Sequence, residues 1–287
     1  MRFRFIQQHT HQFSISLMCV ALSVSRSGYY AWRKRLPSAR ELANERLLTH
    51  IQAAFDWSRN TYGYRRIHAA LMDQGVGCGR NRVARLMHLA GLRGRRRRRY
   101  KITTQSRHKL PVAPNLLSRD FLATAPNQKW VSDITYVRTE QGWLFLAAIL
   151  DLYARLVVGW AIEPYLTTRL TLKALRMALS RRSPLAGLLH HSDRGRQYAS
   201  ADYRQLLSTQ NVVASMSRTG NAYDNAPMES FFATLKIELI HRRHYQNHRE
   251  AKSDIFEYIE VFYNRQRLHS TLQYLSPVDY EALLVAP

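Results

Sequence analysis

The chain has 287 residues, 46% of them hydrophobic, and a formal net charge of +23 at pH 7 with an isoelectric point near 10.6. This length and composition provide one sizeable core and exclude a largely disordered chain, while the excess of Lys and Arg indicates a polyanionic partner, by default nucleic acid. The two cysteines match no zinc spacing, and no apolar run or signal pattern suits a membrane or secretion, so we expect a cytoplasmic protein.

The positive charge is concentrated in the first half of the chain. Residues 1–128 hold 24 of the 43 Lys and Arg but only 5 of the 20 Asp and Glu. The run RGRRRRRYK leads from this half into a Pro-, Ser- and Asn-containing stretch that is typical of a linker. We therefore expect a helical N-terminal segment (1–45), a basic DNA-binding domain (46–100), a linker (101–125) and a core with a helical tail (126–287).

Two helix-turn-helix-like hairpins are predicted in the basic half. In YRRIHAALMDQGVGCGRNRVARLMHLAGL, apolar residues recur at helical spacing on both sides of a glycine-containing turn, and MCVALSVSRSGYYAWRKR has the same outline. On the second predicted helix Arg80, Arg82 and Arg85 fall largely outside the apolar stripe, as a recognition helix lying on phosphates requires. The alternative interpretation is a pair of helical hairpins with solvated basic faces.

An arginine run follows the second hairpin. It includes Arg95, Arg96, Arg97 and Arg98. Such a run binds a DNA backbone by counterion release, whether or not it is ordered, so we expect it to contact DNA. Its alternative interpretation is a flexible, solvated tract.

The second half of the chain predicts an α/β domain. KWVSDITYV, WLFLAAILD and LVVGWAI are typical of three antiparallel strands. A helix, the strand GLLHHSD, a second helix, the short strand VVASMS and the long helix NAPMESFFATLKIELI follow. This order predicts a mixed five-stranded sheet flanked by helices, which matches a ribonuclease H-like fold.

Three carboxylates are placed where such a fold brings them together. Asp193 ends the fourth strand, Asp133 lies on the first strand beside it, and Glu229 lies one turn into the long helix. Three clustered carboxylates repel one another unless cations neutralise them, and their oxygens suit Mg²⁺ or Mn²⁺. Two such ions roughly 3.5–4 Å apart activate a hydroxyl nucleophile and stabilise a leaving oxygen. Taken singly, each residue also fits a turn, a loop cap or a first-turn helix carboxylate.

The motifs of this chain resemble a known family. WVSDITYV, HSDRGRQYAS, SMSRTGNAYDNAPMESFFATLKIEL and FYNRQRLHSTLQYLSPVDY occur in order, and 35 residues separate Asp193 from Glu229. Together with SRSGYYAWRKR and YGYRRIHAAL near the beginning, they resemble the OrfB-type DDE transposases of bacterial insertion sequences, which share an integrase catalytic core with retroviral integrases. The resemblance spans nearly the whole chain.

The resemblance implies a transposase that catalyses metal-dependent DNA strand cleavage and strand transfer at insertion-sequence ends. It makes Asp133, Asp193 and Glu229 the catalytic residues and the metal ligands. The metal it implies is Mg²⁺ or Mn²⁺, bound as two ions. Lys236 is then the basic residue that holds DNA beside this triad. Water first attacks at an element end, and the freed 3′-hydroxyl then attacks another phosphodiester.

The resemblance also implies partners. These are double-stranded DNA of the element ends and the target, further copies of the chain because two ends are processed together, and the product of an upstream frame as a fusion or separate protein. We expect the protein at the bacterial nucleoid. The chain departs from the pattern at Arg196, which stands where a small residue is expected and either contacts a phosphate or crowds the loop.

Other polar residues keep two interpretations. His191 is expected to be a structural histidine rather than a residue that faces the metals. Asp224 and Asn225 fit a turn and a helix N-cap first and DNA contact second. The tail residues Asn264, Arg267 and His269 suit helix-end structure or DNA contact. The alternative for the whole chain is a helix-turn-helix repressor, or an inactive transposase relative, that binds element ends without cutting.

Overall fold

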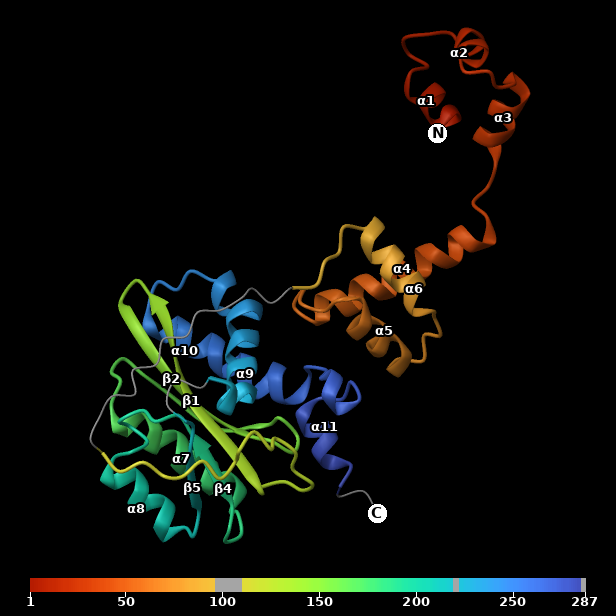
Figure 1. The fold of residues 1–287 in the computed structure, drawn as a ribbon. Coiled ribbons are helices and arrows are strands. Elements are labelled where there is room, and N and C mark those ends of the chain that lie inside the picture. The colour runs from red at the N-terminus through yellow and green to blue at the C-terminus, as the bar shows by residue number, and fades with distance from the viewer. Residues whose placement is uncertain (96–109, 219–221, 285–287) are drawn as a thin grey trace. The chain divides into compact units, whose positions relative to one another are not determined.

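The protein divides into two compact units, residues 1–53 and 54–287 (Figure 1). The computed structural model describes residues 1–95, 110–218 and 222–284. Within these ranges no helix combines the length and the apolar composition that crossing a membrane requires.

The N-terminal unit is a small helical module. It contains three short helices, α1 (Arg2–Gln8), α2 (Ile15–Ala21) and α3 (Arg26–Lys34). Their apolar faces bury a core of Ile6, Met18, Cys19 and Tyr29. Serine side chains cap the N-termini of α2 and α3. The Ser14 hydroxyl accepts a hydrogen bond from the Leu17 amide, and the Ser25 hydroxyl accepts one from the Gly28 amide. The longer α4 (Ala39–Trp57) begins in this unit and ends in the next.

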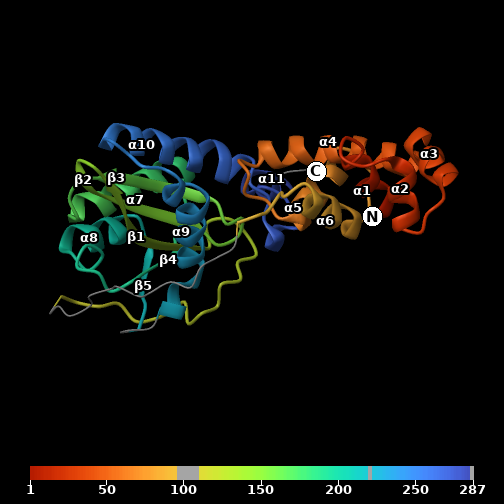
Figure 2. The same ribbon diagram turned by 90° about the horizontal axis from the view of Figure 1, so that it is seen from above.

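The second unit begins with a helical hairpin. Its helices α5 (Tyr64–Asp73) and α6 (Arg80–Leu89) lie side by side in Figure 2. The apolar residues at helical spacing form the buried face, as predicted: Ile67, Ala70, Leu71, Val83, Leu86 and Met87. The turn between the helices uses Gly75 at a φ of +75°, a conformation that favours glycine.

The five-stranded mixed sheet expected from the sequence is confirmed. Its strands are β1 (Lys129–Thr139), β2 (Gly142–Asp151), β3 (Val157–Glu163), β4 (Leu189–Ser192) and β5 (Val213–Met216). They lie in the order β3-β2-β1-β4-β5, with β2 antiparallel to both β1 and β3, and β4 parallel to both β1 and β5. The parallel pairs are what place the end of β4 beside the middle of β1.

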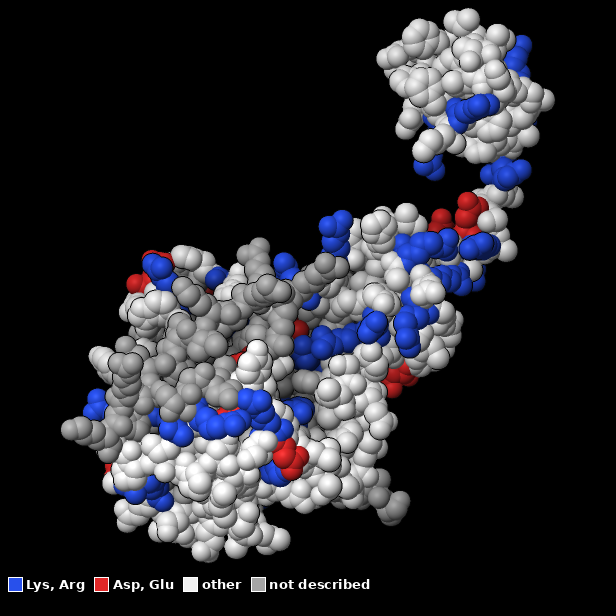
Figure 3. Space-filling model, viewed as in Figure 1, with Lys and Arg blue, Asp and Glu red and all other residues white. Residues whose placement is uncertain are grey.

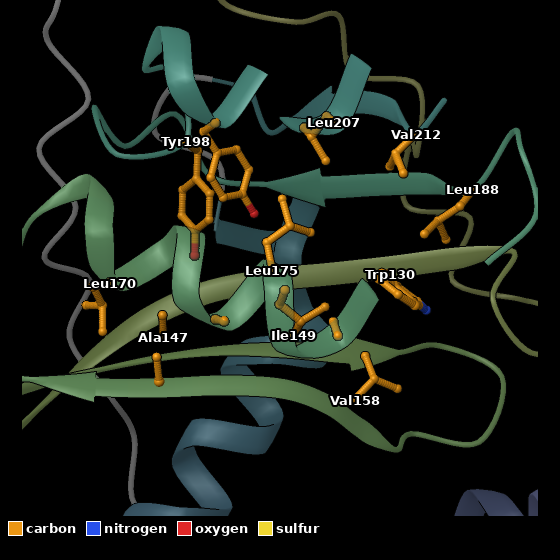
Figure 4. Packing of buried hydrophobic residues seen from close by; sticks show 14 of the residues in the cluster. Trp130, Ala147, Ile149, Val158, Leu170, Leu175, Leu188, Tyr198, Leu207 and Val212 are labelled. Carbon is orange, nitrogen blue, oxygen red and sulfur yellow. The ribbon is translucent and has the colours of Figure 1, made fainter. Parts of the chain in front are cut away.

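Helices cover both faces of this sheet. The helices that follow β3 are α7 (Thr168–Arg182), α8 (Ala201–Thr209), α9 (Ala226–Glu238), α10 (His248–Glu257) and α11 (Pro277–Ala282). Figure 4 shows Leu170 and Leu175 of α7 against the strand residues of the main core. The approach is close, because a Cβ on Gly159 of β3 would lie 2.4 Å from the Ala174 carbonyl oxygen. The side chains of β1 alternate, so Trp130 points into this core and Asp133 points to the face where α9 packs.

A buried ion pair fixes the end of α9 to the C-terminal tail. The Arg267 guanidinium donates to Glu238 in a bidentate arrangement, with Nε–Oε2 at 2.9 Å and Nη2–Oε1 at 2.7 Å. The two side chains are only 5% and 6% exposed. The Tyr258 hydroxyl donates a third hydrogen bond to Glu238 at 2.8 Å. Of the two interpretations of Arg267, helix-end structure and DNA contact, this buried pair supports the structural one.

We predict that Glu238→Gln lowers the free energy of unfolding at pH 7 by about 3–5 kcal/mol, because it leaves the buried Arg267 charge without its counterion. Burial raises the pKa of Glu238, but Arg267 and Tyr258 outweigh it and bring that pKa below the ordinary 4.5. The stabilisation is therefore present above pH 4.5 and lost as the pH falls through the lower folded-state value. Urea unfolding at several pH values measures both effects.

The matched control for this prediction is Glu257→Gln. Glu257 pairs with Arg59 at 2.8 Å, but its side chain is 59% exposed, so its removal costs at most about 1 kcal/mol. Equal losses of unfolding free energy in the two variants would show that the buried pair does not stabilise this part of the fold.

Candidate active site

The pairing of β1 with β4 sets two carboxylates at the same level of the sheet. Val131 lies opposite His191 in the parallel register. Asp133 and Asp193 each follow two residues later, and Asp193 lies close enough to act on the charge of Asp133. Asp133 remains within β1, whereas Asp193 directly follows β4. The strand thus ends one residue earlier than the sequence predicted, and Asp193 is the first residue after it.

The third carboxylate comes from the first turn of α9. Asp224 and Asn225 end a short 3-10 turn, and Pro227 lies in the first turn of the helix, where its missing amide is not needed. Glu229 lies in the same turn and is exposed, which the positive end of the helix dipole favours.

The electrostatics connect these residues. Burial raises the pKa of Asp133 well above its ordinary value, and the neighbouring charges of Asp193 and Glu229 raise it further. The Lys236 ammonium opposes this shift. Asp193, Glu229 and Lys236 thus each act on Asp133, the first from the end of β4 and the other two from α9.

The donors at this position fit a hard divalent cation. Asp133 and Asp193 each accept a backbone amide on one oxygen, from Ile134 at 2.7 Å and from Gly195 at 2.8 Å. Carboxylate oxygens without a thiolate are the ligands that Mg²⁺ and Mn²⁺ prefer. Over the described ranges, however, no group of three His, Cys, Asp or Glu side chains is gathered closely enough to hold a metal. Among the described residues, Asp193 and Glu229 thus act electrostatically on Asp133, but the three side chains are not gathered into a metal site.

Lys236 of α9 is a buried cation near Asp133. Its side chain is buried, and its Nζ lies 4.8 Å from the centroid of the Tyr136 ring on β1. Burial lowers the pKa of Lys236, and the charges of Tyr136 and Asp133 partly restore it. In this position its positive charge is directed at Asp133.

A fourth carboxylate, Asp224, anchors the turn before α9. Its buried oxygens accept hydrogen bonds from Asn115 Nδ2 at 2.9 Å, from Arg119 Nε at 3.0 Å, and from the amide and guanidinium of Arg218. These donors, led by the Arg218 side chain, lower the pKa of Asp224. The sequence indicated a turn here but not this network, because its partners lie up to 109 residues away.

Of two roles expected near this turn, that of Asn225 differs in detail and that of His191 does not. Asn225 occupies the N-cap position of α9, but its side chain makes no capping bond and instead donates to the Ser132 carbonyl of β1 at 3.0 Å. His191 is the structural histidine that was expected. Its two ring nitrogens contact the hydroxyls of Ser215 and Ser217 at 2.8 and 3.0 Å.

The basic residues predicted to contact DNA are largely on the surface. Arg80 and Arg85 on α6 are exposed, Arg82 is half-buried, and Arg95 and Arg196 are exposed. Figure 3 shows Lys and Arg gathered over the helices α5 and α6 on the face in view. Three further predicted DNA contacts, Arg96, Arg97 and Arg98, lie outside the described residues.

Comparisons with known proteins match both the helical region that contains α5 and α6 and the domain that contains the sheet. Models of an integrase core domain match residues 123–222 and 229–283, and a model of an HTH-like domain matches residues 42–100. A simian T-cell lymphotropic virus intasome gives a TM-score of 0.48 at 14% identity, covering 76% of this chain and 70% of that one. The HTLV-2 integrase catalytic core domain in complex with magnesium gives 0.44 at 13% identity, covering 56% and 99%. The family models give this chain an integrase core domain and an HTH-like domain.

Sequence relatives then give the family. An uncharacterized 31 kDa protein of insertion element IS600 from Shigella sonnei is 51% identical over 263 residues, 92% of this chain and 97% of the relative. Transposase InsF for insertion sequence IS3A from Escherichia coli K12 is 43% identical over 283 residues, 98% of both chains. The chain belongs to this family of insertion-sequence transposases.

We predict that Asp224→Asn lowers the free energy of unfolding by about 1–3 kcal/mol, because it weakens charge-assisted hydrogen bonds whose arginine partners are about half exposed. Hydrogen exchange at the amides of the first turn of α9 should also become faster. The exposed Asp202 on α8 provides the control, since Asp202→Asn removes the same charge without a network. Unchanged exchange in Asp224→Asn would mean that Asp224 does not position this helix.

Proposed function

We propose that this DNA transposase cuts and joins DNA strands with Asp133, Asp193 and Glu229 as its catalytic residues. The observation that carries the proposal is the parallel register of β1 and β4, which sets two of the carboxylates side by side while α9 adds the charge of the third. Mg²⁺ or Mn²⁺, two ions in our proposal, would supply a hydroxyl nucleophile at neutral pH and neutralise charge on the transferring phosphate.

The chain's own residues account for the remaining requirements. Asp133 and Asp193 each have one oxygen fixed by a backbone amide, so their orientation is set before any ligand arrives. Asp224 and Asn225 hold the turn that positions Glu229. Lys236 places a positive charge beside Asp133, where it would help to hold the phosphate of a bound strand.

DNA binding follows from the HTH-like and integrase domains. We propose that Arg80, Arg82 and Arg85 of α6 and the arginine run after it contact DNA phosphates, and that Arg196 adds a contact beside Asp193. Two element ends must meet before joining, so we propose that the active form is a multimer of this chain on DNA. The product of an upstream frame is a further proposed partner, and the bacterial nucleoid is the proposed location.

We predict that Glu229→Gln and Asp193→Asn each reduce strand transfer by about 10²-fold or more, because a group that stabilises charge in the transition state is lost. The assay follows a labelled oligonucleotide that carries the element end as it joins plasmid DNA, with Mg²⁺ or Mn²⁺ and again with EDTA. Asp202→Asn on α8 is the matched control and should join at the wild-type rate.

The outcome separates the catalytic proposal from a protein that only binds DNA. Joining that needs the metal and is lost in the triad variants would establish the proposed roles. Tight binding with no joining under either metal, both for the chain alone and for its fusion to the upstream product, would favour a binding protein. Normal joining by Glu229→Gln would remove Glu229 from the site.

A further inference from the structure

A basic cleft lies on another face of α9. Its volume is about 340 Å³, and its wall includes Ser230 and Thr234 of α9. On a helix these residues lie about 100–140° around the axis from Glu229, whereas Lys236 lies nearly in line with Glu229. The cleft is therefore separate from the space between the carboxylates, with α9 between them.

Three arginines give this cleft an unbalanced positive charge. Arg66 of α5, Arg155 of the β2–β3 turn and Arg267 of the tail all line it. Two of the three share one carboxylate, Glu238. Arg267 binds it through two hydrogen bonds, and Arg66 Nη1 lies 3.9 Å from its Oε1. Among the described residues no carboxylate forms an ion pair with Arg155.

The groups inside the cleft respond to this charge. Burial and the charges of Arg267, Arg66 and Arg155 hold the pKa of His269 well below its ordinary value, so His269 is neutral at pH 7 and does not add to the charge. Burial also lowers the pKa of Arg155. A half-buried guanidinium that has lost water without gaining a carboxylate is stabilised by a bound anion.

The backbone holds Arg155 in this position at a cost. Arg155 has a φ of +56°, in the left-handed region that side chains other than glycine and asparagine rarely adopt. A non-glycine residue in such a conformation is strained and persists where the surrounding structure holds it. The hydroxyls of Ser230, Thr234 and Thr271 line the same cleft and can donate to phosphate oxygens.

We propose that this cleft binds a backbone phosphate of DNA, with Arg155 and Arg66 as its cationic contacts and the hydroxyls of α9 as additional donors. The inference rests on the proposed function, since it assigns a second anchor for the DNA on which the carboxylates act. The volume suits a phosphate and its sugar rather than a duplex. One strand held here would lie against the helix that carries Glu229.

The experiment is a double-mutant cycle in EDTA, where binding is measured without strand transfer. An oligonucleotide duplex carrying the element end is scanned with single neutral methylphosphonates, and the dissociation constant is measured for the wild type and Arg155→Gln. Loss of one phosphate contact should weaken binding roughly tenfold at about 0.1 M salt and reduce the salt slope by about 0.9. At the phosphate in the cleft, the methylphosphonate should weaken the wild type by this factor and Arg155→Gln by less than about twofold.

Two further variants act as controls. Arg155→Lys keeps the charge and should keep the coupling to the same phosphate. Arg249→Gln removes the same charge from an exposed residue of α10 outside the cleft and should show no coupling to that phosphate. If Arg155→Gln does not fold, as judged by thermal unfolding, Arg66→Gln replaces it in the cycle with the same expected coupling.

The outcomes separate this inference from the proposed function. If no phosphate couples to Arg155 or Arg66 while strand transfer is normal, the cleft is not a DNA site and the catalytic proposal stands. If one phosphate couples but neither the wild type nor its fusion to the upstream product joins DNA, the cleft binds DNA and the catalytic proposal fails.

Discussion

The parallel pairing of β1 with β4 is the constraint on which the site depends. The two strands run in the same direction and are paired up to Val131 and His191, so Asp133 and Asp193, each two residues further on, come close to one another beyond the paired residues. The opposite face of β1 is filled by the core under α7, so Asp133 cannot turn away from the site without entering an apolar interior. The shifted pKa of Asp133 reflects this arrangement, since burial and two like charges all disfavour its ionised form.

The helix α9 depends on contacts at both of its ends. Asp224 gathers Arg119 and Arg218 around the turn before it, and Glu238 near its other end is bound by Arg267 from the tail. These contacts join segments that are far apart in the sequence, which is why a charged network rather than local propensity sets where the helix lies. One face of α9 then carries Glu229 and Lys236, and another lines the basic cleft.

The sequence predicted the elements well and the contacts between them poorly. Strand alternation and helical spacing were sufficient for the five strands and the hairpin of α5 and α6, because both patterns are local. The place of Asp193 at a strand end followed from the break at Gly195. The partners of Asp224 and Arg267 could not be predicted, since they depend on tertiary packing across up to 109 residues. The cleft with Arg155 was missed because its lining comes from six separate stretches of the chain and no motif marks it.

In the proposed mechanism Asp133, Asp193 and Glu229 together bind the divalent cations. The most direct test is titration of Mn²⁺ into the DNA-bound protein, followed by electron paramagnetic resonance, for the wild type and for Asp193→Asn. The account predicts tight sites in the wild type that Mg²⁺ displaces and that are lost or strongly weakened in the variant. Equal numbers of bound ions with equal affinity in the two proteins would contradict it.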